Sequence, residues 1–248
     1  MNATGSLAIF IPVTIVYFIL KYYLIDSKMS ESGTLSSIIT IGYLIIIVGY
    51  QIGVNISQSS QLCNGTPQVL PAIMYTLLPN FLIFGTLILL LNMFPGWRAP
   101  FSNTIGFMVV SVFMGMNGTF NDLLETKKGS KLLEKICTDK SLIINEMTHA
   151  NYDIFLSNLS KDGILNPKYT TLDAYKDLWK YIAIKNNIAD FIWYTLTGML
   201  VIFTTSNALL DIRCSYTEKQ SAANSDKFEE SQNKMNSKDK PKFYTQRS

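Results

Sequence analysis

The sequence predicts an all-α polytopic membrane protein with four or five transmembrane helices, a small helical extramembrane domain and a disordered C-terminal tail. Between Ser32 and Asn121 the only charged side chain is Arg98. A soluble surface needs many more ionised groups to stay hydrated, whereas a charge at the centre of a bilayer is costly. A hydrophobic fraction of 48% agrees with a membrane location. Lipid is therefore expected to surround the first half of the chain.

Three apolar runs in this half are long enough to cross a bilayer, which takes about 20 helical residues. They cover residues 7–25, 35–56 and 69–94. In the second run, Gly49 and Gly53 have the spacing of a Gly-x-x-x-Gly motif, which permits close helix contact. Pro79 interrupts the third run, so we expect a kink there.

A block rich in proline and glycine follows the third run and predicts a rigid corner at the membrane interface. It reads Pro-Gly-Trp-Arg-Ala-Pro-Phe-Ser-Asn-Thr-Ile-Gly over residues 95–106. Indole and guanidinium groups suit the headgroup layer, and the side-chain oxygens of Ser102 and Asn103 can cap the next helix. The predicted corner consists of Pro95, Gly96, Trp97, Arg98, Pro100, Phe101, Ser102 and Asn103.

The next stretch, residues 105–120, leaves the span count open. Its apolar core, Ile105–Met116, is shorter than a span, so the stretch either crosses with its polar flanks drawn in or forms a re-entrant or tilted segment. We favour five spans, in which the 57–68 loop shares a face with the extramembrane domain and the tail lies on the other face. With four spans, the domain and the tail exchange sides.

Residues 121–187 predict the extramembrane domain, because apolar residues such as Leu172, Tyr175 and Trp179 recur at helical spacing. Residues 188–212 predict the last span. The basic tail, residues 213–248, is rich in Ser, Asn, Lys and Gln. It cannot bury enough apolar surface to offset its ordering entropy, and we expect it to be disordered.

The sequence contains no motif for catalysis or for binding a cofactor or a metal, and we expect no enzymatic activity. His149, the only histidine, has no evident partner, which favours a polar surface position over a general base. The cysteines are too far apart to indicate a metal site. In the five-span arrangement Cys63 and Cys137 share a face and can form a disulfide, while Cys214 lies across the membrane.

The remaining polar and charged groups give no sharper function. Polar side chains of the apolar runs and their flanks can line a water-filled pore, but hydrogen bonds between helices are the favoured interpretation. The candidates are Asn55, Ser57, Asn80, Asn92 and Asn103. The net charge of +3 is too small to predict a nucleic-acid-binding face.

A resemblance to a known family rests on three stretches within residues 60–120. They are Cys63-Asn-Gly-Thr, Thr76-Leu-Leu-Pro-Asn-Phe-Leu-Ile-Phe-Gly85 and, most specifically, Pro-Gly-Trp-x-x-Pro-Phe-Ser-Asn-Thr-x-Gly at 95–106. Together they resemble a family of multi-pass virion membrane proteins of nucleocytoplasmic large DNA viruses, including algal and giant viruses. No enzymatic activity is attached to this motif.

The resemblance implies a component of the internal virion membrane, derived from the host endoplasmic reticulum and lying beneath an icosahedral capsid. We therefore expect a structural membrane protein, such as a minor capsid protein, whose domain or tail contacts the capsid or other virion membrane proteins. The domain offers aromatic side chains that we expect to be exposed for such contacts: Tyr152, Phe155, Tyr169, Trp179 and Tyr181. The alternative is a channel or a fusion-complex subunit in the same membrane.

Overall fold

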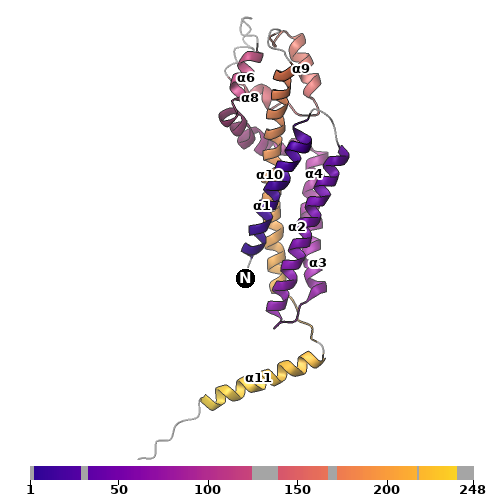
Figure 1. Cartoon of the computed structure of the whole chain (residues 1–248), viewed down its shortest axis with the longest axis vertical. Coiled ribbons are helices and arrows are strands. Elements are labelled where there is room, and N and C mark those ends of the chain that lie inside the picture. Colours follow the sequence, from indigo (N-terminus) through magenta and orange to yellow (C-terminus); the bar gives the residue numbers. More distant parts are fainter. Residues whose placement is uncertain (1–2, 29–32, 125–138, 167–171, 217, 239–248) are drawn as a thin grey trace, which may run out of the picture.

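The structure, a computed structural model, describes residues 3–28, 33–124, 139–166, 172–216 and 218–238. The secondary structure of these residues is helical, apart from one isolated antiparallel bridge between Leu124 and Leu165. Figure 1 shows a long helical bundle with a small helical unit at one end and helix α11 beyond the other end. The predicted all-α polytopic membrane fold is confirmed.

Four helical stretches are long and apolar enough to cross a membrane: Gly5–Asp26, Gly33–Leu62, Val69–Met93 and Ala174–Leu210. They consist of α1 (Ala3–Lys21) with the π-helical turn η1 (Tyr22–Asp26), α2 (Gly33–Leu62), α3 (Val69–Pro79) with η2 (Asn80–Gly85) and α4 (Thr86–Met93), and α10 (Leu172–Leu210). Large apolar side chains are exposed on all four, for example Val16, Ile45, Phe81 and Leu200. Such a surface suits hydrocarbon as its solvent.

The interior of the bundle is aromatic and contains hydroxyl groups that pair between helices. Tyr17 of α1 stacks on Tyr43 of α2, with ring centroids 4.3 Å apart, and the ring of Tyr194 on α10 lies 5.9 Å from that of Tyr17. The Thr14 and Tyr43 hydroxyls lie 2.9 Å apart, and so do those of Tyr17 and Thr40. Because lipid offers no polar partner, these hydroxyls bind one another.

Close helix contact occurs at a different glycine from the ones in the predicted motif. A Cβ atom at Gly49 or Gly53 would meet nothing within 4 Å, so this motif contacts no helix of the described chain. A Cβ at Gly198 of α10, by contrast, would overlap the ring of Phe10 on α1. The absence of a side chain at Gly198 is what allows these two helices to approach.

The predicted irregularity at Pro79 is a π-helical segment, η2, that begins directly after it. Proline cannot donate the usual backbone hydrogen bond, and the helix register changes at this point. The carbonyl of Thr76 accepts a hydrogen bond of 2.9 Å from the side-chain amide of Asn80. A side chain of the same helix therefore binds a carbonyl at this irregularity.

The segment that follows α4 remains at one end of the bundle. It contains η3 (Pro95–Arg98), α5 (Ala99–Phe101), η4 (Ser102–Gly106), η5 (Val109–Phe113) and α6 (Met116–Leu123). The chain bends by 84° between Phe113 and Met116, where Gly115 has a φ of 72°. Positive φ values favour glycine, so Gly115 permits the sharp bend.

Contacts with α10 show how far this segment travels. Arg98 bonds to Asp190 and Asn103 to Lys185, and the Thr119 hydroxyl lies 3.2 Å from that of Tyr181. The segment therefore advances along α10 from residue 190 only to residue 181, about 14 Å at roughly 1.5 Å per residue. A crossing requires about 30 Å. Residues 105–120 thus stay on one side, and the favoured five-span arrangement is replaced by four spans.

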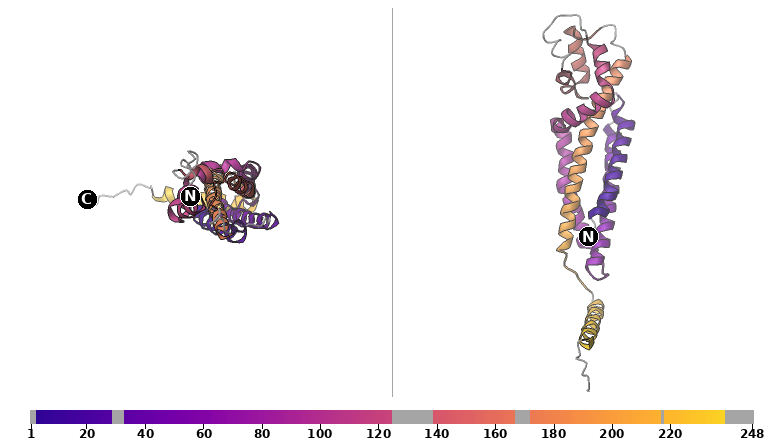
Figure 2. Two further views of the ribbon diagram at one scale, coloured as in Figure 1. Left: turned by 90° about the horizontal axis from the view of Figure 1, so that it is seen from above. Right: turned by 90° about the vertical axis from the view of Figure 1, so that its left-hand side faces the viewer.

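The extramembrane domain packs around the first half of α10. Helices α6, α8 (Ser141–Ile144) and α9 (Tyr152–Lys161) surround it, and Leu178 and Ile182 of α10 belong to the shared core. Figure 2 shows α10 continuing from this domain into the bundle. The expected division at residues 187 and 188 falls inside this continuous helix. Of the predicted domain, residues 125–138 and 167–171 lie outside the described residues.

Within the predicted tail the structure describes one helix, α11 (Glu218–Lys238), which lies apart from the bundle in Figure 1. Its described side chains are exposed, except for the half-buried Asn224. Good helix formers and a pair between Lys234 Nζ and Glu230 Oε1, 2.7 Å apart, favour local helix. The tail buries no core of its own in these residues. Residues 239–248 lie outside the described chain.

Candidate functional site

A cluster of four charged side chains lies where the bundle meets the extramembrane domain. Arg98 Nε lies 2.6 Å from Asp190 Oδ1, and Lys21 Nζ lies 3.5 Å from the other oxygen of the same carboxylate. Lys21 Nζ also lies 3.2 Å from Asp26 Oδ2. The side chain of Asp190 is only 7% exposed. This cluster ties together the end of α1, the corner after α4 and the middle of α10.

Local backbone geometry brings Arg98 into the cluster. The chain leaves helical geometry at Phe94, with φ −127° and ψ 76°, and Pro95 then starts the short η3 helix. This turn directs the Arg98 guanidinium back, and its Nη1 donates a hydrogen bond of 2.8 Å to the carbonyl of Leu91. Since this carbonyl belongs to the last turn of α4, Arg98 also satisfies one of the free groups at the helix end.

The aromatic residues of the predicted corner gather around Trp193 of α10. Trp193 Nε1 donates a hydrogen bond of 2.9 Å to the carbonyl of Trp97, and the two indoles lie 6.3 Å apart. The ring of Phe101 meets Trp193 edge-on at 5.1 Å. Trp97 remains 49% exposed. Half-exposed indoles at this height suit the headgroup layer.

Ser102 and Asn103 do not cap a helix, so that prediction is wrong. Ser102 Oγ donates a hydrogen bond of 2.9 Å to Asn186 Oδ1. Asn103 Oδ1 accepts one of 3.2 Å from Lys185 Nζ. Lys185 is 1% exposed, and its Nζ also donates a hydrogen bond of 2.8 Å to the carbonyl of Ile144. The side chains of Ser102 and Asn103 thus bind α10, because the chain packs alongside that helix at this point.

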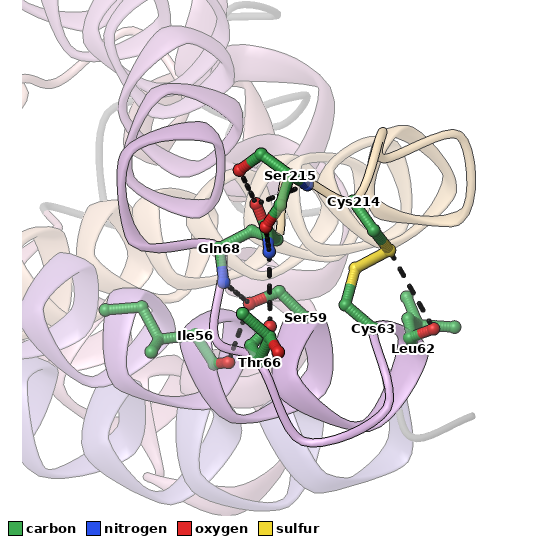
Figure 3. Close-up of a disulfide and its surroundings, with 8 residues drawn as sticks. All are labelled: Ile56, Ser59, Leu62, Cys63, Thr66, Gln68, Cys214 and Ser215. Carbon is green, nitrogen blue, oxygen red and sulfur yellow. Dashed lines mark hydrogen bonds between the residues drawn. A yellow bond between two sulfur atoms is a disulfide. The ribbon is translucent and has the colours of Figure 1, made fainter. Parts of the chain in front are cut away.

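The predicted Cys63–Cys137 disulfide is also wrong, because Cys63 is bonded to Cys214 (Figure 3). Cys137 lies outside the described residues. Gln68 supports the junction: its Oε1 accepts hydrogen bonds from Ser215 N and Ser215 Oγ at 3.2 and 2.7 Å. A bond between Cys63 and Cys214 requires an even number of crossings between them. The third span and α10 supply two, which agrees with four spans.

His149 is half-buried, so the predicted surface position is wrong. Its ring stacks on Trp179 with centroids 4.3 Å apart, and its Nε2 has no hydrogen-bond partner in the described chain. Burial, assisted by the positive charges of Lys21 and Arg98, lowers the pKa of His149 to about 4. Neutral histidine is therefore the form that fits here at physiological pH.

The expected polar contacts between helices are present in the membrane bundle. Asn55 Nδ2 donates a hydrogen bond of 2.7 Å to the Thr76 hydroxyl, and Asn80 Nδ2 donates one of 2.8 Å to Gln51 Oε1. These amides join α2 to the third span. Of the other asparagines considered for a pore, Asn103 binds Lys185, as described above.

Asn92 lines two cavities beside the charged cluster. One has a volume of about 510 Å³ and also touches Tyr17, Lys21, Ser36 and Arg98. The other, of about 320 Å³, reaches His149. Among the described residues, no group of three or more His, Cys, Asp and Glu side chains is arranged to hold a metal ion.

Sequence reasoning missed three of the residues that build these sites: Asp190, Lys185 and Cys214. One signal for Asp190 was present. Arg98 is the only charge between Ser32 and Asn121, and Asp190 is the acid that directly precedes the last apolar run. A lone charge at the edge of a low-dielectric region needs a partner of opposite charge. This requirement favours a pair between Arg98 and Asp190.

Comparison with known proteins adds no relative to this geometry. No protein-family model, curated protein or solved structure matches the chain.

Proposed function

We propose that this protein is a structural membrane protein that fixes a rigid helical domain to the internal membrane of a large DNA virus. The observation that carries the proposal is the continuity of α10. Leu178 and Ile182 lie in the core of the domain, while Tyr194 and Val201 lie in the core of the bundle, all on one uninterrupted helix. A domain attached in this way transmits its position to the bilayer without a flexible linker, as an anchor between membrane and protein shell requires.

The two ends of the bundle support a definite orientation. The Cys63–Cys214 disulfide joins the residues that follow the end of α2 and the end of α10, and Figure 1 shows these helix ends opposite the domain. Disulfides persist in oxidising compartments, so this end is assigned to the lumen of the endoplasmic reticulum. Lys21, Lys28, Arg98 and Lys185 lie at the domain end, close to the ends of the spans. At the opposite end the 57–68 loop carries no charge, and the tail adds Arg213 and Lys219 within ten residues of α10. The positive-inside bias then assigns the domain to the cytosolic face, where capsid proteins are available.

The surface of the domain offers aliphatic contacts in place of the predicted aromatic ones. Tyr152 is 1% exposed, and Phe155, Trp179 and Tyr181 pack against the domain core. Tyr169 lies outside the described residues. The exposed large apolar residues of the described domain are Leu142 and Ile154, at 53% and 68%. A protein partner is therefore expected to cover these two residues.

Site-specific photo-cross-linking in assembled particles tests the proposal. The full-length chain would carry a photoreactive residue at Ile154, and a matched variant would carry it at the lipid-facing Leu200. We expect the first variant to yield an adduct with a capsid or other virion membrane protein, and the second to label lipid. Absence of the chain from purified particles, or an adduct only with lipid at position 154, would contradict the proposal.

The asparagines considered for a pore support this anchoring function over a channel. The side-chain amides of Asn55 and Asn80 donate hydrogen bonds to residues of neighbouring helices. Reconstituted protein is accordingly expected to pass no more ions than protein-free vesicles do.

A further inference from the structure

The larger of the two cavities lies at the domain end of the bundle, between α1, α2, α4 and α10. Its volume of about 510 Å³ is in the range of small-molecule sites in proteins. Anchoring to a capsid requires no ligand here. The cavity therefore raises a separate question, which is what occupies it in a membrane.

The walls of the cavity change polarity along the bundle axis in one direction. On α2, Ser36 comes first from the domain end, and Ile41 and Leu44 follow one and two turns farther into the membrane. On α1, the order from the same end is Lys21 and then Phe18. The charged groups thus lie at headgroup height. The deeper wall, at the height of acyl chains, contains Ile41, Leu44 and Ile88 beside Tyr17 and Thr40, whose hydroxyls bind each other. A phospholipid has the same order of polar and apolar parts.

Two basic side chains and one carboxylate face the cavity: Lys21, Arg98 and Asp190. The carboxylate of Asp26, 3.2 Å from Lys21 Nζ, lines the neighbouring cavity, so the four charges of the cluster balance. Two of the three guanidinium nitrogens of Arg98 are used, by Asp190 and by the Leu91 carbonyl. The second terminal nitrogen bonds to no described residue and remains available. A guanidinium with a free donor beside an ammonium group suits a phosphodiester.

We propose that this cavity binds one membrane phospholipid. Arg98 and Lys21 hold its phosphodiester, Ser36 and the first turn of α2 add hydrogen-bond donors, and an acyl chain lies along Ile41, Leu44 and Ile88. Inorganic phosphate would satisfy the charged part alone. It would leave the apolar wall without a partner, so a lipid explains more of the cavity than a free anion does.

Lipid retention by the purified full-length protein tests the proposal. After extraction in mild detergent and extensive washing, we expect native mass spectrometry to detect about one phospholipid per chain. Arg98→Gln should reduce the retained fraction about fivefold, which corresponds to the loss of one basic contact with a headgroup. Arg213→Gln makes the same change at the opposite end of the bundle and should retain lipid as the unmodified protein does. Equal retention in both variants would overturn the proposal.

A second variant separates lipid binding from the integrity of the charged cluster. Ser36→Phe places a ring in the cavity without altering Arg98, Lys21 or Asp190. We expect it to lose the bound lipid while thermal unfolding in detergent stays close to that of the unmodified protein. Retention of lipid by this variant would contradict the proposal. So would protection of the delipidated protein against unfolding by inorganic phosphate to the same degree as by a short-chain phospholipid, because the site would then take a free anion.

Discussion

The two halves of α10 lie in two cores that are built on different principles. Its first half packs Leu178 and Ile182 in a core that is mainly aliphatic, with two methionines and the rings of Phe120 and Tyr152. Its second half packs Tyr194 among rings whose hydroxyl groups pair between helices. Water drives the first core together by the hydrophobic effect, whereas lipid gives no such drive and leaves close packing and hydrogen bonds. One helix therefore obeys two sets of stability rules.

The largest expected effect lies in the aqueous core. Ile182 is fully buried, so Ile182→Ala should lower the free energy of unfolding of the domain by about 2–5 kcal/mol, through lost transfer energy and a residual cavity. Hydrogen exchange of the full-length protein in detergent measures the loss. Ile154→Ala, at a site 68% exposed, should change it by less than about 0.5 kcal/mol. Equal losses would contradict the assigned core.

The junction between the halves comes next. Asp190→Asn leaves Arg98 and Lys21 without their shared carboxylate and should cost about 3 kcal/mol. The double variant with Arg98→Gln should cost less than the sum of the two single changes, because the unpaired guanidinium is removed as well. The exposed pair Lys180–Asp177 is the matched control, expected to contribute less than about 1 kcal/mol. Additive losses at the junction would show that the two groups do not interact.

In the membrane half, Gly198→Ala should cost about 1–3 kcal/mol, because its Cβ would overlap the ring of Phe10. Adding Phe10→Leu should recover part of the loss. Gly49→Ala, where a Cβ meets nothing within 4 Å, is the control and should leave the thermal unfolding temperature unchanged or slightly raised. A similar decrease at both glycines would contradict the packing explanation, because helix propensity alone favours alanine at either site.

Acid should weaken the domain before it weakens the bundle. Burial holds the pKa of His149 at about 4, below its usual 6.5, so the folded state favours the neutral ring. Stability is then fully present above about pH 6.5 and is lost as the pH falls toward 4, by roughly 3 kcal/mol, since the unfolded chain takes up the proton first. His149→Phe should flatten this dependence in unfolding followed by tryptophan fluorescence. An unchanged slope would exclude His149 as its cause.

How much of this comparison the sequence could reveal depends on the range of the contacts involved. The apolar runs and the corner at 95–106 are local patterns, and both could be predicted. The path of residues 98–119 along α10 depends on partners such as Asp190 and Tyr181, which lie 92 and 62 residues away along the chain. Whether residues 105–120 cross the membrane decides whether the number of spans is four or five. Because we favoured five, we placed Cys214 on the opposite face from Cys63 and expected Cys137 as its partner.

The Cys63–Cys214 bond gives the smallest expected effect, and the comparison of solvents explains why. In water, closing a loop with a sequence separation of 151 would stabilise by about 5 kcal/mol through the entropy of the unfolded chain. In lipid the unfolded helices stay inserted, so both cysteines already share one membrane face. Cys63→Ser should therefore cost only about 1 kcal/mol in bicelles, well below Ile182→Ala. On non-reducing gels Cys63→Ser and Cys214→Ser should migrate alike and differently from Cys137→Ser; a shift caused by Cys137→Ser would refute both the pairing and the four-span parity.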